Sequence, residues 1–305
     1  MHRNDSRYPG PPSWLTRRGA MLGALAVPML PRSGAAQVPA AVSRPVPSTP
    51  MAPGFGVARA LPAPHPLSAQ DARRFLALRA RLDGKPVFAI ARGTDFAIVE
   101  GRSIPLRGNL ILQATRAIDL GDGGWALPYV ETTVVTEHGS FVHRPEWENP
   151  LTGVRQPVAT PQVSLVRLRM DAAGALSNHL EVPSGLVVDY DGVVAAQAGL
   201  EGAAWATQSL HLHFRRPGGD EEDAYVTTTM MQTGPERRGF LPTDSNSVSS
   251  RPRIPSALSG GRPGSLLSTF FGRKYETPDS LRRTLEPAHQ ALLAPYFDHW
   301  RSLLP

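Results

Sequence analysis

The sequence predicts a mainly β fold: a curled antiparallel sheet or β-barrel of about nine strands, with an N-terminal helix and C-terminal helices. Three observations predict this fold. After Lys85, runs rich in β-branched and aromatic residues alternate apolar and polar side chains. Gly, Asp and Pro residues separate these runs, and no helical pattern lies between them. Strands that follow one another directly pair antiparallel, and about nine of them over roughly 150 residues favour closure or strong curling.

Residues 1–36 are expected to be a secretion signal and not part of the fold. Arg17 and Arg18 directly precede a 12-residue apolar run, which is too short to span a bilayer, and small residues follow it. This order is typical of a twin-arginine signal, and the general secretory route is the alternative. The twin-arginine export machinery is therefore an expected partner. The expected location is periplasmic or secreted, with no stable membrane span.

A tether and a helix are expected to precede the strands. Residues 37–67 are mostly Pro, Ala and Ser, and they predict an extended, poorly ordered tether. Residues 68–305 are expected to form a single β-rich domain with a C-terminal helical tail. Ser68 is expected to cap a helix over 68–82, in which an apolar stripe packs on the domain. Its solvent-facing side is expected to carry Arg73, Arg74, Arg79 and Arg81.

The expected strands come in close succession. They are residues 86–91, 96–100, 109–119, 125–138, 162–170, 185–190, 193–198, 203–215 and 224–233. Asp191 and Gly192 separate two of these runs and predict a two-residue hairpin turn of primed type. A second reversal is expected at the Gly-rich residues 121–124.

Two long loops and a tail complete the domain. The loops are residues 143–161 and 234–263, and loops of this length are usually lids, binding loops or disordered segments. Residues 278–304 predict a helical tail, capped by Asp279 and Ser280, that is interrupted by Pro. This tail is expected to cover a sheet edge or a barrel mouth.

Composition excludes several functions. The chain has no Cys, which excludes disulfides, a cysteine nucleophile and thiolate metal sites. Its net charge is +6, but the expected signal holds five Arg and one Asp, which leaves about +2 on the mature chain. No stripe of basic residues interleaved with aromatics is present. A nucleic-acid partner is therefore not expected.

His211 and His213 form the first candidate site. They lie two residues apart on an expected strand, so both side chains share one face with Trp205. If that face lines a cavity, the imidazoles and Glu131 of a neighbouring strand could act as acid and base or hold a metal, and Trp205 could contact a ligand. Asp189 is an alternative partner. If the face points to water, these residues are ordinary strand residues, so metal content and cofactor stay unknown.

Two further motifs lie at the predicted loops. Trp147 and Asn149 sit beside a rigid Asn-Pro bend, where they could form one wall of a ligand pocket or plug the end of the sheet. Arg262, Lys274 and Tyr275 lie in Gly-rich segments, where the cations could receive an anion or belong to a solvated turn.

Several of these segments together resemble the bacterial and fungal family called domain of unknown function 1838. They are residues 83–87 (DGKPV), 147–153 (WENPLTG), 261–267 (GRPGSLL) and 272–275 (GRKY), in that order. The resemblance covers most of residues 67–305, and members often carry a twin-arginine signal. Where relatives have a Trp-Met-Arg-Met type stretch, this chain has SALS at 256–259. The resemblance implies no activity and no catalytic residues.

Three functions are compatible with these observations. The first is a binding or carrier protein that takes a small, partly apolar molecule into the barrel interior. The second is a cofactor-free or metal-assisted enzyme, a hydrolase, lyase or cyclase, with His211 or His213 as general base. The third is a structural envelope protein with a filled core and an exposed apolar patch.

Overall fold

The computed structural model describes residues 67–158, 161–181, 186–198, 202–217, 219 and 221–303. The predicted signal, 1–36, lies outside the described residues, as does the predicted tether except for Leu67. Twin-arginine export and a periplasmic or secreted location therefore stay predictions. No helix in the described part of the chain is long and apolar enough to cross a membrane.

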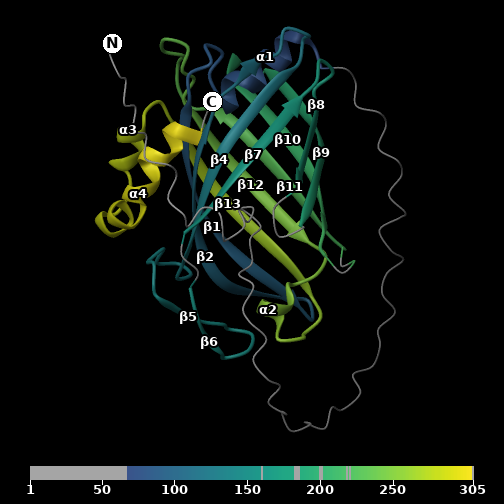
Figure 1. Cartoon of the computed structure of the whole chain (residues 1–305), viewed down its shortest axis with the longest axis vertical. Helices are drawn as coiled ribbons and strands as arrows, with labels where there is room; N and C mark the ends of the chain where they lie inside the picture. The colour runs from purple at the N-terminus through teal and green to yellow at the C-terminus, as the bar shows by residue number, and fades with distance from the viewer. Residues whose placement is uncertain are drawn as a thin grey trace, which may run out of the picture.

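Ten antiparallel strands close into a barrel (Figure 1). In the order in which they pair, they are β2 (Arg102–Thr115), β1 (Val87–Val99), β13 (Ser265–Tyr275), β12 (Thr243–Arg251), β11 (Glu221–Gln232), β10 (Ala204–Arg215), β9 (Val187–Ala198), β8 (Ala175–Glu181), β7 (Gln162–Met170) and β4 (Trp125–Thr136). Pairing between β2 and β4 closes the ring. The predicted fold class is confirmed, with ten barrel strands where about nine were expected.

Three short strands lie outside the ring. The two-residue strand β3 (Ile118–Asp119) pairs with the start of β4, and the expected reversal at residues 121–124 joins them. Strands β5 (Glu146–Glu148) and β6 (Arg155–Pro157) form a separate two-stranded sheet within the predicted loop 143–161. That loop prediction is therefore correct except for this small sheet.

Two predicted breaks between strands are absent. At both places a glycine allows close packing and does not form a turn. Residues 86–91 and 96–100 belong to the single strand β1, and a Cβ on Gly93 would collide with the Phe270 ring. The Asp191-Gly192 hairpin is also absent, since β9 runs through both residues. A Cβ on Gly192 would collide with the carbonyl oxygen of Ser209 on β10. Both glycines let neighbouring groups approach the backbone of a curved sheet.

Three strands of the barrel were not predicted: β8, β12 and β13. The predicted loop 234–263 is wrong over β12, which pairs with β11 and β13 along most of its length. Its sequence is rich in Ser and Asn, which have low β propensity, so pairing on both sides decides its conformation.

Helix α1 (Ala69–Arg79) closes one end of the barrel, at the top of Figure 1. The Ser68 hydroxyl accepts a hydrogen bond from the Asp71 backbone N–H at 3.1 Å, which confirms the predicted cap. Phe75, Leu76 and Leu78 are fully buried against the strands. The prediction that four arginines of the predicted helix face solvent is wrong in part. Arg81 is 5% exposed and forms ion pairs with Asp83 and Glu276. Arg79 enters the barrel.

The opposite end is closed by α2 (Ser256–Ser259) and the β5–β6 sheet (Figure 1). Leu151, Ile254 and Leu258 pack there against the ends of the barrel strands in a separate apolar cluster. Packed elements thus lie at both ends of the barrel.

Helices α3 (Pro278–Arg282) and α4 (Pro287–Leu303) pack on the outer wall of the barrel, and not on a mouth or edge as predicted (Figure 1). Thr277, and not Asp279 or Ser280, is the cap of α3: its hydroxyl accepts from the Ser280 N–H at 3.1 Å. Trp300 is fully buried, stacks on Phe88 of β1, and donates an Nε1–H hydrogen bond to the Thr132 hydroxyl at 3.0 Å.

Alternation along each strand decides which side chains enter the interior. On β10, the even-numbered residues from Ala206 to Phe214 are buried inside. The odd-numbered residues from Trp205 to His213 are half-buried on the outer face. The inward face of this strand is therefore apolar, with Gln208 as its polar exception.

Candidate functional site

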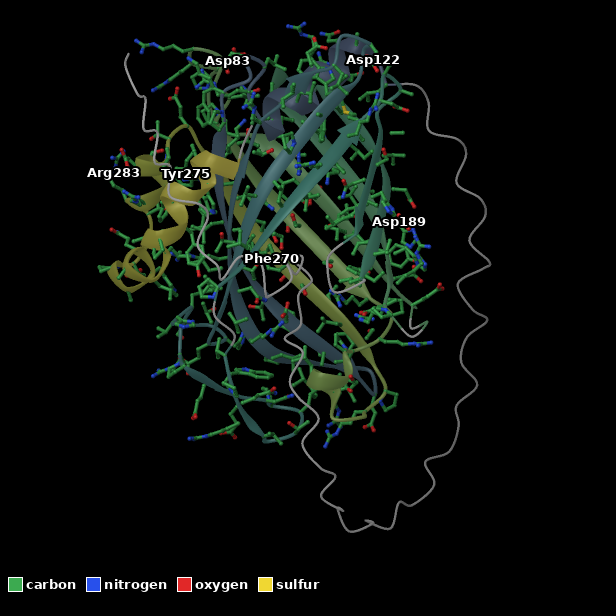
Figure 2. All side chains as sticks on the ribbon, in the orientation of Figure 1. Asp83, Asp122, Asp189, Phe270, Tyr275 and Arg283 are labelled. Carbon is green, nitrogen blue, oxygen red and sulfur yellow. The ribbon has the colours of Figure 1, made fainter. Side chains whose placement is uncertain are left out.

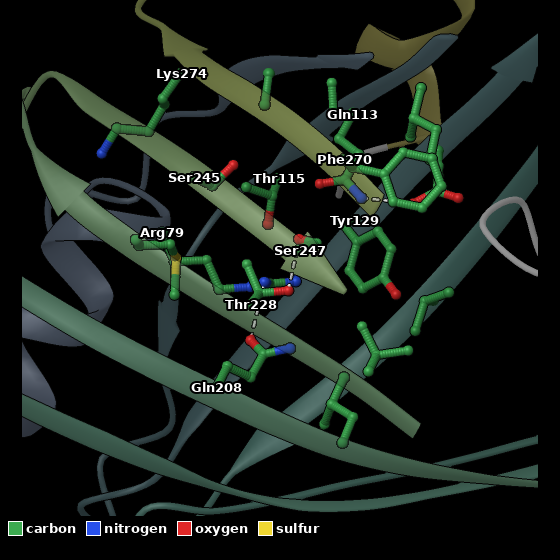
Figure 3. Close-up of a pocket in the computed structure, with 18 of the residues that line it drawn as sticks. Arg79, Gln113, Thr115, Tyr129, Gln208, Thr228, Ser245, Ser247, Phe270 and Lys274 are labelled. Atoms are coloured by element: carbon green, nitrogen blue, oxygen red, sulfur yellow. Dashed lines mark hydrogen bonds between the residues drawn. The ribbon is translucent and has the colours of Figure 1, made fainter. Parts of the chain in front are cut away.

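A partly open cavity of about 170 Å³, lined in part by residues of α1, lies inside the barrel (Figure 3). Most of its wall is apolar, from Leu78, Ile111, Val166, Leu210, Leu212, Val226, Met230 and Phe270. A smaller polar part is built from Arg79, Gln113, Tyr129, Glu131, Gln208, Thr228, Ser245 and Ser247. An apolar pocket with a few convergent polar groups is typical of a small-molecule site.

Arg79 reaches from the last residue of α1 into this cavity. Its Nη1 donates a hydrogen bond to Gln208 Oε1 at 3.0 Å, drawn as a dashed line in Figure 3, and the guanidinium carbon lies 5.3 Å from the centre of the Tyr129 ring. The residue is half-buried and lines the cavity. Burial lowers the pKa of Arg79, which nevertheless stays charged at neutral pH.

Glu131 lies on β4, opposite Gln113 of β2. Its Oε2 accepts a hydrogen bond from Gln113 Nε2 at 2.5 Å, and Thr133 Oγ1 donates to Oε1 at 3.4 Å. The residue is 4% exposed. Burial, together with the Glu131 charge, raises the pKa of Tyr129 and of Tyr190, so both phenols keep their protons.

The inner face of β12 provides the space for the cavity. Ser245, Ser247 and Ser249 alternate along this strand and point inward, and Thr228 of β11 shares a hydrogen bond with Ser247 at 2.8 Å. Small hydroxyl side chains leave volume that leucine or valine would fill. The period-two serine pattern was present in the sequence, but the segment was assigned to a loop.

Lys274 lines the cavity (Figure 3). The other two residues of the predicted anion site, Arg262 and Tyr275, do not line it. The Nζ of Lys274 donates to the carbonyl oxygens of Ala77 at 2.6 Å and Ala80 at 3.2 Å, at the C-terminal end of α1. Burial, and to a lesser extent the charge of Arg81, lowers its pKa to about 7. The ammonium thus joins the helix to β13.

This burial predicts that stability rises with pH above neutrality. The folded pKa of Lys274 is about 7 against an ordinary value of 10.5, so between these pH values the unfolded chain binds a proton that the folded chain lacks. The free energy of unfolding should rise by up to about 1.4 kcal/mol per pH unit. Urea unfolding at pH 7, 8 and 9 measures this slope, which Lys274→Met should reduce.

Lys85 provides the matched control, because it is the other lysine of the chain and its side chain is 71% exposed. Lys85→Met should keep the slope of the unmodified protein. Equal slopes in the Lys274→Met variant and the unmodified protein would contradict the prediction.

The proposed grouping of Arg262, Lys274 and Tyr275 is wrong. Arg262 is exposed and follows α2, at the end of the barrel opposite to α1. Tyr275 packs with the apolar cluster under the C-terminal helices, as Figure 2 shows. Alternation on β13 separates Tyr275 from Lys274, so of the three residues only Lys274 meets the cavity.

His211, His213 and Trp205 lie on the outer face of β10, not in the cavity. The hypothesis that the imidazoles work with Glu131 is therefore wrong, because the barrel wall separates them. His211 Nε2 and His213 Nδ1 instead lie 2.8 and 3.0 Å from Asp223 Oδ1. Figure 2 shows Asp189, the register partner of His213, on the same outer side.

Partial burial lowers the pKa of His211, but hydrogen bonds to Asp223 and Asp191 outweigh this effect and raise it overall. Within the described residues, no group of three or more His, Asp and Glu side chains is placed to hold a metal ion. The outer imidazoles of β10 are cross-strand partners of the Asp223 carboxylate of β11.

Trp147 and Asn149 hold the cap at the end of the barrel away from α1. Asn149 is fully buried; its Nδ2 donates to the Leu258 carbonyl at 2.8 Å, and its Oδ1 accepts from the Leu151 N–H at 2.9 Å. Trp147 Nε1 donates to the Leu106 carbonyl at 3.0 Å. The sequence allowed two roles for Trp147 and Asn149, a pocket wall or a plug at the end of the sheet. These contacts match the plug, and neither side chain lines the cavity.

Comparison of the chain with family models, curated proteins and solved structures found no match. The resemblance to domain of unknown function 1838 stays a prediction. Inferences about function therefore depend on the cavity itself.

Proposed function

We propose that this protein binds a small, partly apolar molecule inside the barrel. The observation that supports the proposal is the cavity of about 170 Å³ inside the barrel, whose surface is mostly apolar and carries polar groups from several strands. A cavity of about 150 Å³ holds benzene in another protein, so a molecule with one ring fits this space. The ligand is expected to contact apolar side chains with its body and the polar groups with its substituents.

The alternative functions have less support. An enzyme with His211 or His213 as general base requires one of these side chains in the cavity, but both lie on the outer face of β10. The cavity argues against a structural protein with a filled core. Binding in the interior is the function that the geometry favours.

Filling the cavity should abolish binding. Phenol is a suitable probe, because it has one apolar ring and one hydroxyl group. We expect saturation-transfer NMR and calorimetry to detect phenol binding to the full chain, and Ser247→Phe to remove it. The phenylalanine would project into the cavity from β12. Its cost in stability is expected to be about 1–3 kcal/mol, as for other overpacked interiors.

Asn246→Phe is the matched control, since Asn246 is exposed on the same strand. It should leave phenol binding unchanged. Circular dichroism of both variants checks that they fold. Undiminished phenol binding by a folded Ser247→Phe variant, or no binding by the unmodified protein, would count against the proposal.

A further inference from the structure

The guanidinium of Arg79 is a half-buried charge inside the barrel. Its direct partners are neutral: the Gln208 side-chain carbonyl and the face of the Tyr129 ring. The Glu131 carboxylate acts on it from a distance and favours its charged form. The salt bridges among the described residues do not include Arg79. A buried cation without a directly paired anion is costly, and buried charges in proteins are usually paired.

One edge of this guanidinium has unused hydrogen-bonding capacity. Nη1 is the nitrogen that bonds to Gln208, and Nε is buried without a hydrogen-bond partner. A buried donor without an acceptor costs about 1–3 kcal/mol. A carboxylate placed along the edge formed by Nε and Nη2 would accept two parallel hydrogen bonds and neutralise the charge.

Lys274 and Glu131 line the same cavity. The Nζ of Lys274 donates to the backbone carbonyls of Ala77 and Ala80, so Arg79 is the cation there with an unused donor. Glu131 is the opposing charge, and its oxygens accept hydrogen bonds from Gln113 of β2 and from Thr133 of its own strand. The Tyr129 phenol keeps its proton, so it can donate to an anion.

We infer that the ligand of this cavity is a compact carboxylate, a monocarboxylic acid with an apolar body about the size of one ring, whose carboxylate binds Arg79. This inference rests on the proposed function, since it names the chemical class of the molecule bound in the barrel. The apolar wall of Leu210, Leu212, Val226 and Met230 surrounds the body of the ligand.

Benzoate and benzamide test the inference in the full-length protein. The two probes have nearly the same shape, and only benzoate carries a charge at neutral pH. We expect calorimetry at pH 7 to show that benzoate binds about ten- to hundredfold more tightly than benzamide, as a charge-assisted pair requires. This comparison uses the unmodified protein, so it does not depend on the folding of any variant.

Variants of α1 then identify the cation. Arg79→Met should lower the affinity for benzoate about ten- to hundredfold and that for benzamide, whose carbonyl carries no charge, by less than about tenfold, so that the preference for benzoate is lost. Arg79→Lys keeps a charge without the planar edge and should retain part of the preference for benzoate. Arg73→Met is the matched control, because Arg73 is exposed on the same helix, and it should change neither affinity.

The outcomes separate this inference from the proposed function. If benzamide or phenol binds as tightly as benzoate, and Ser247→Phe removes that binding, interior binding stands and the carboxylate inference is wrong. If benzoate binds equally well to a folded Arg79→Met variant, the assignment to Arg79 is wrong. If no probe binds the unmodified protein, the proposed function itself fails, and the inference fails with it.

Discussion

Trp300→Ala is expected to lower the free energy of unfolding by about 3–5 kcal/mol and to release α4 from the barrel wall. Trp300 has no exposed surface, and its ring packs on Phe88 and Phe297 with centroid distances of 6.4 and 5.1 Å. The Thr132 hydroxyl would also lose the hydrogen bond that Trp300 Nε1–H donates to it. Alanine would leave a large void that the rigid outer wall cannot fill. Urea unfolding measures the loss.

Trp300→Phe is the control for this prediction. It keeps an aromatic ring against Phe88 but removes the hydrogen bond to Thr132, so it should cost clearly less than alanine. Limited proteolysis should cut α4 in the alanine variant before it cuts the barrel strands. A loss below about 1 kcal/mol for Trp300→Ala would show that α4 contributes little to stability.

Asp95→Asn is expected to cost about 3–5 kcal/mol, because it leaves the charge of Arg107 uncompensated inside the barrel. The two side chains are 6% and 7% exposed, and Arg107 Nε lies 2.8 Å from Asp95 Oδ2. Ser268 Oγ donates to the other oxygen, Oδ1, at 2.6 Å. Unfolding by urea at pH 7 tests this value.

Two further variants separate charge from shape at this pair. The double variant Asp95→Asn with Arg107→Met removes both charges and should recover part of the loss. Asp122→Asn is the matched control, since its pair with Arg169 has both side chains more than half exposed. That change should cost less than about 1 kcal/mol. Equal losses at the buried and the exposed pair would refute the argument from burial.

The fold class was predictable because strand alternation is a local property. The two faces of β10 were visible in the sequence, but which face turns inward was not. Both faces mix polar and apolar residues, with Gln208 among leucines on one and His211 beside Ser209 on the other. The choice depends on how ten strands close, which involves contacts between residues far apart in the chain.

The candidate site was mostly not predictable. Glu131 was identified and does line the cavity, whereas Arg79 was assigned to the solvent-facing side of its helix. A signal for Arg79 did exist: it follows Phe75 by four residues, so both lie on one face of the helix. The charge of Arg79 led to the solvent-facing prediction, although its position on the helix favoured the buried face. At β12, low strand propensity hid the serines that make room for a ligand.

The pairing of β1 with β13 joins the first strand of the barrel to its last, with Phe88 opposite Tyr275. Contacts between such distant segments are formed late and slowly during folding. While the chain is being synthesised, the barrel cannot close until β13 has left the ribosome. Until then, β1 and β12 are open edges that can pair with other chains, so the nascent protein depends on chaperones or rapid completion to avoid aggregation.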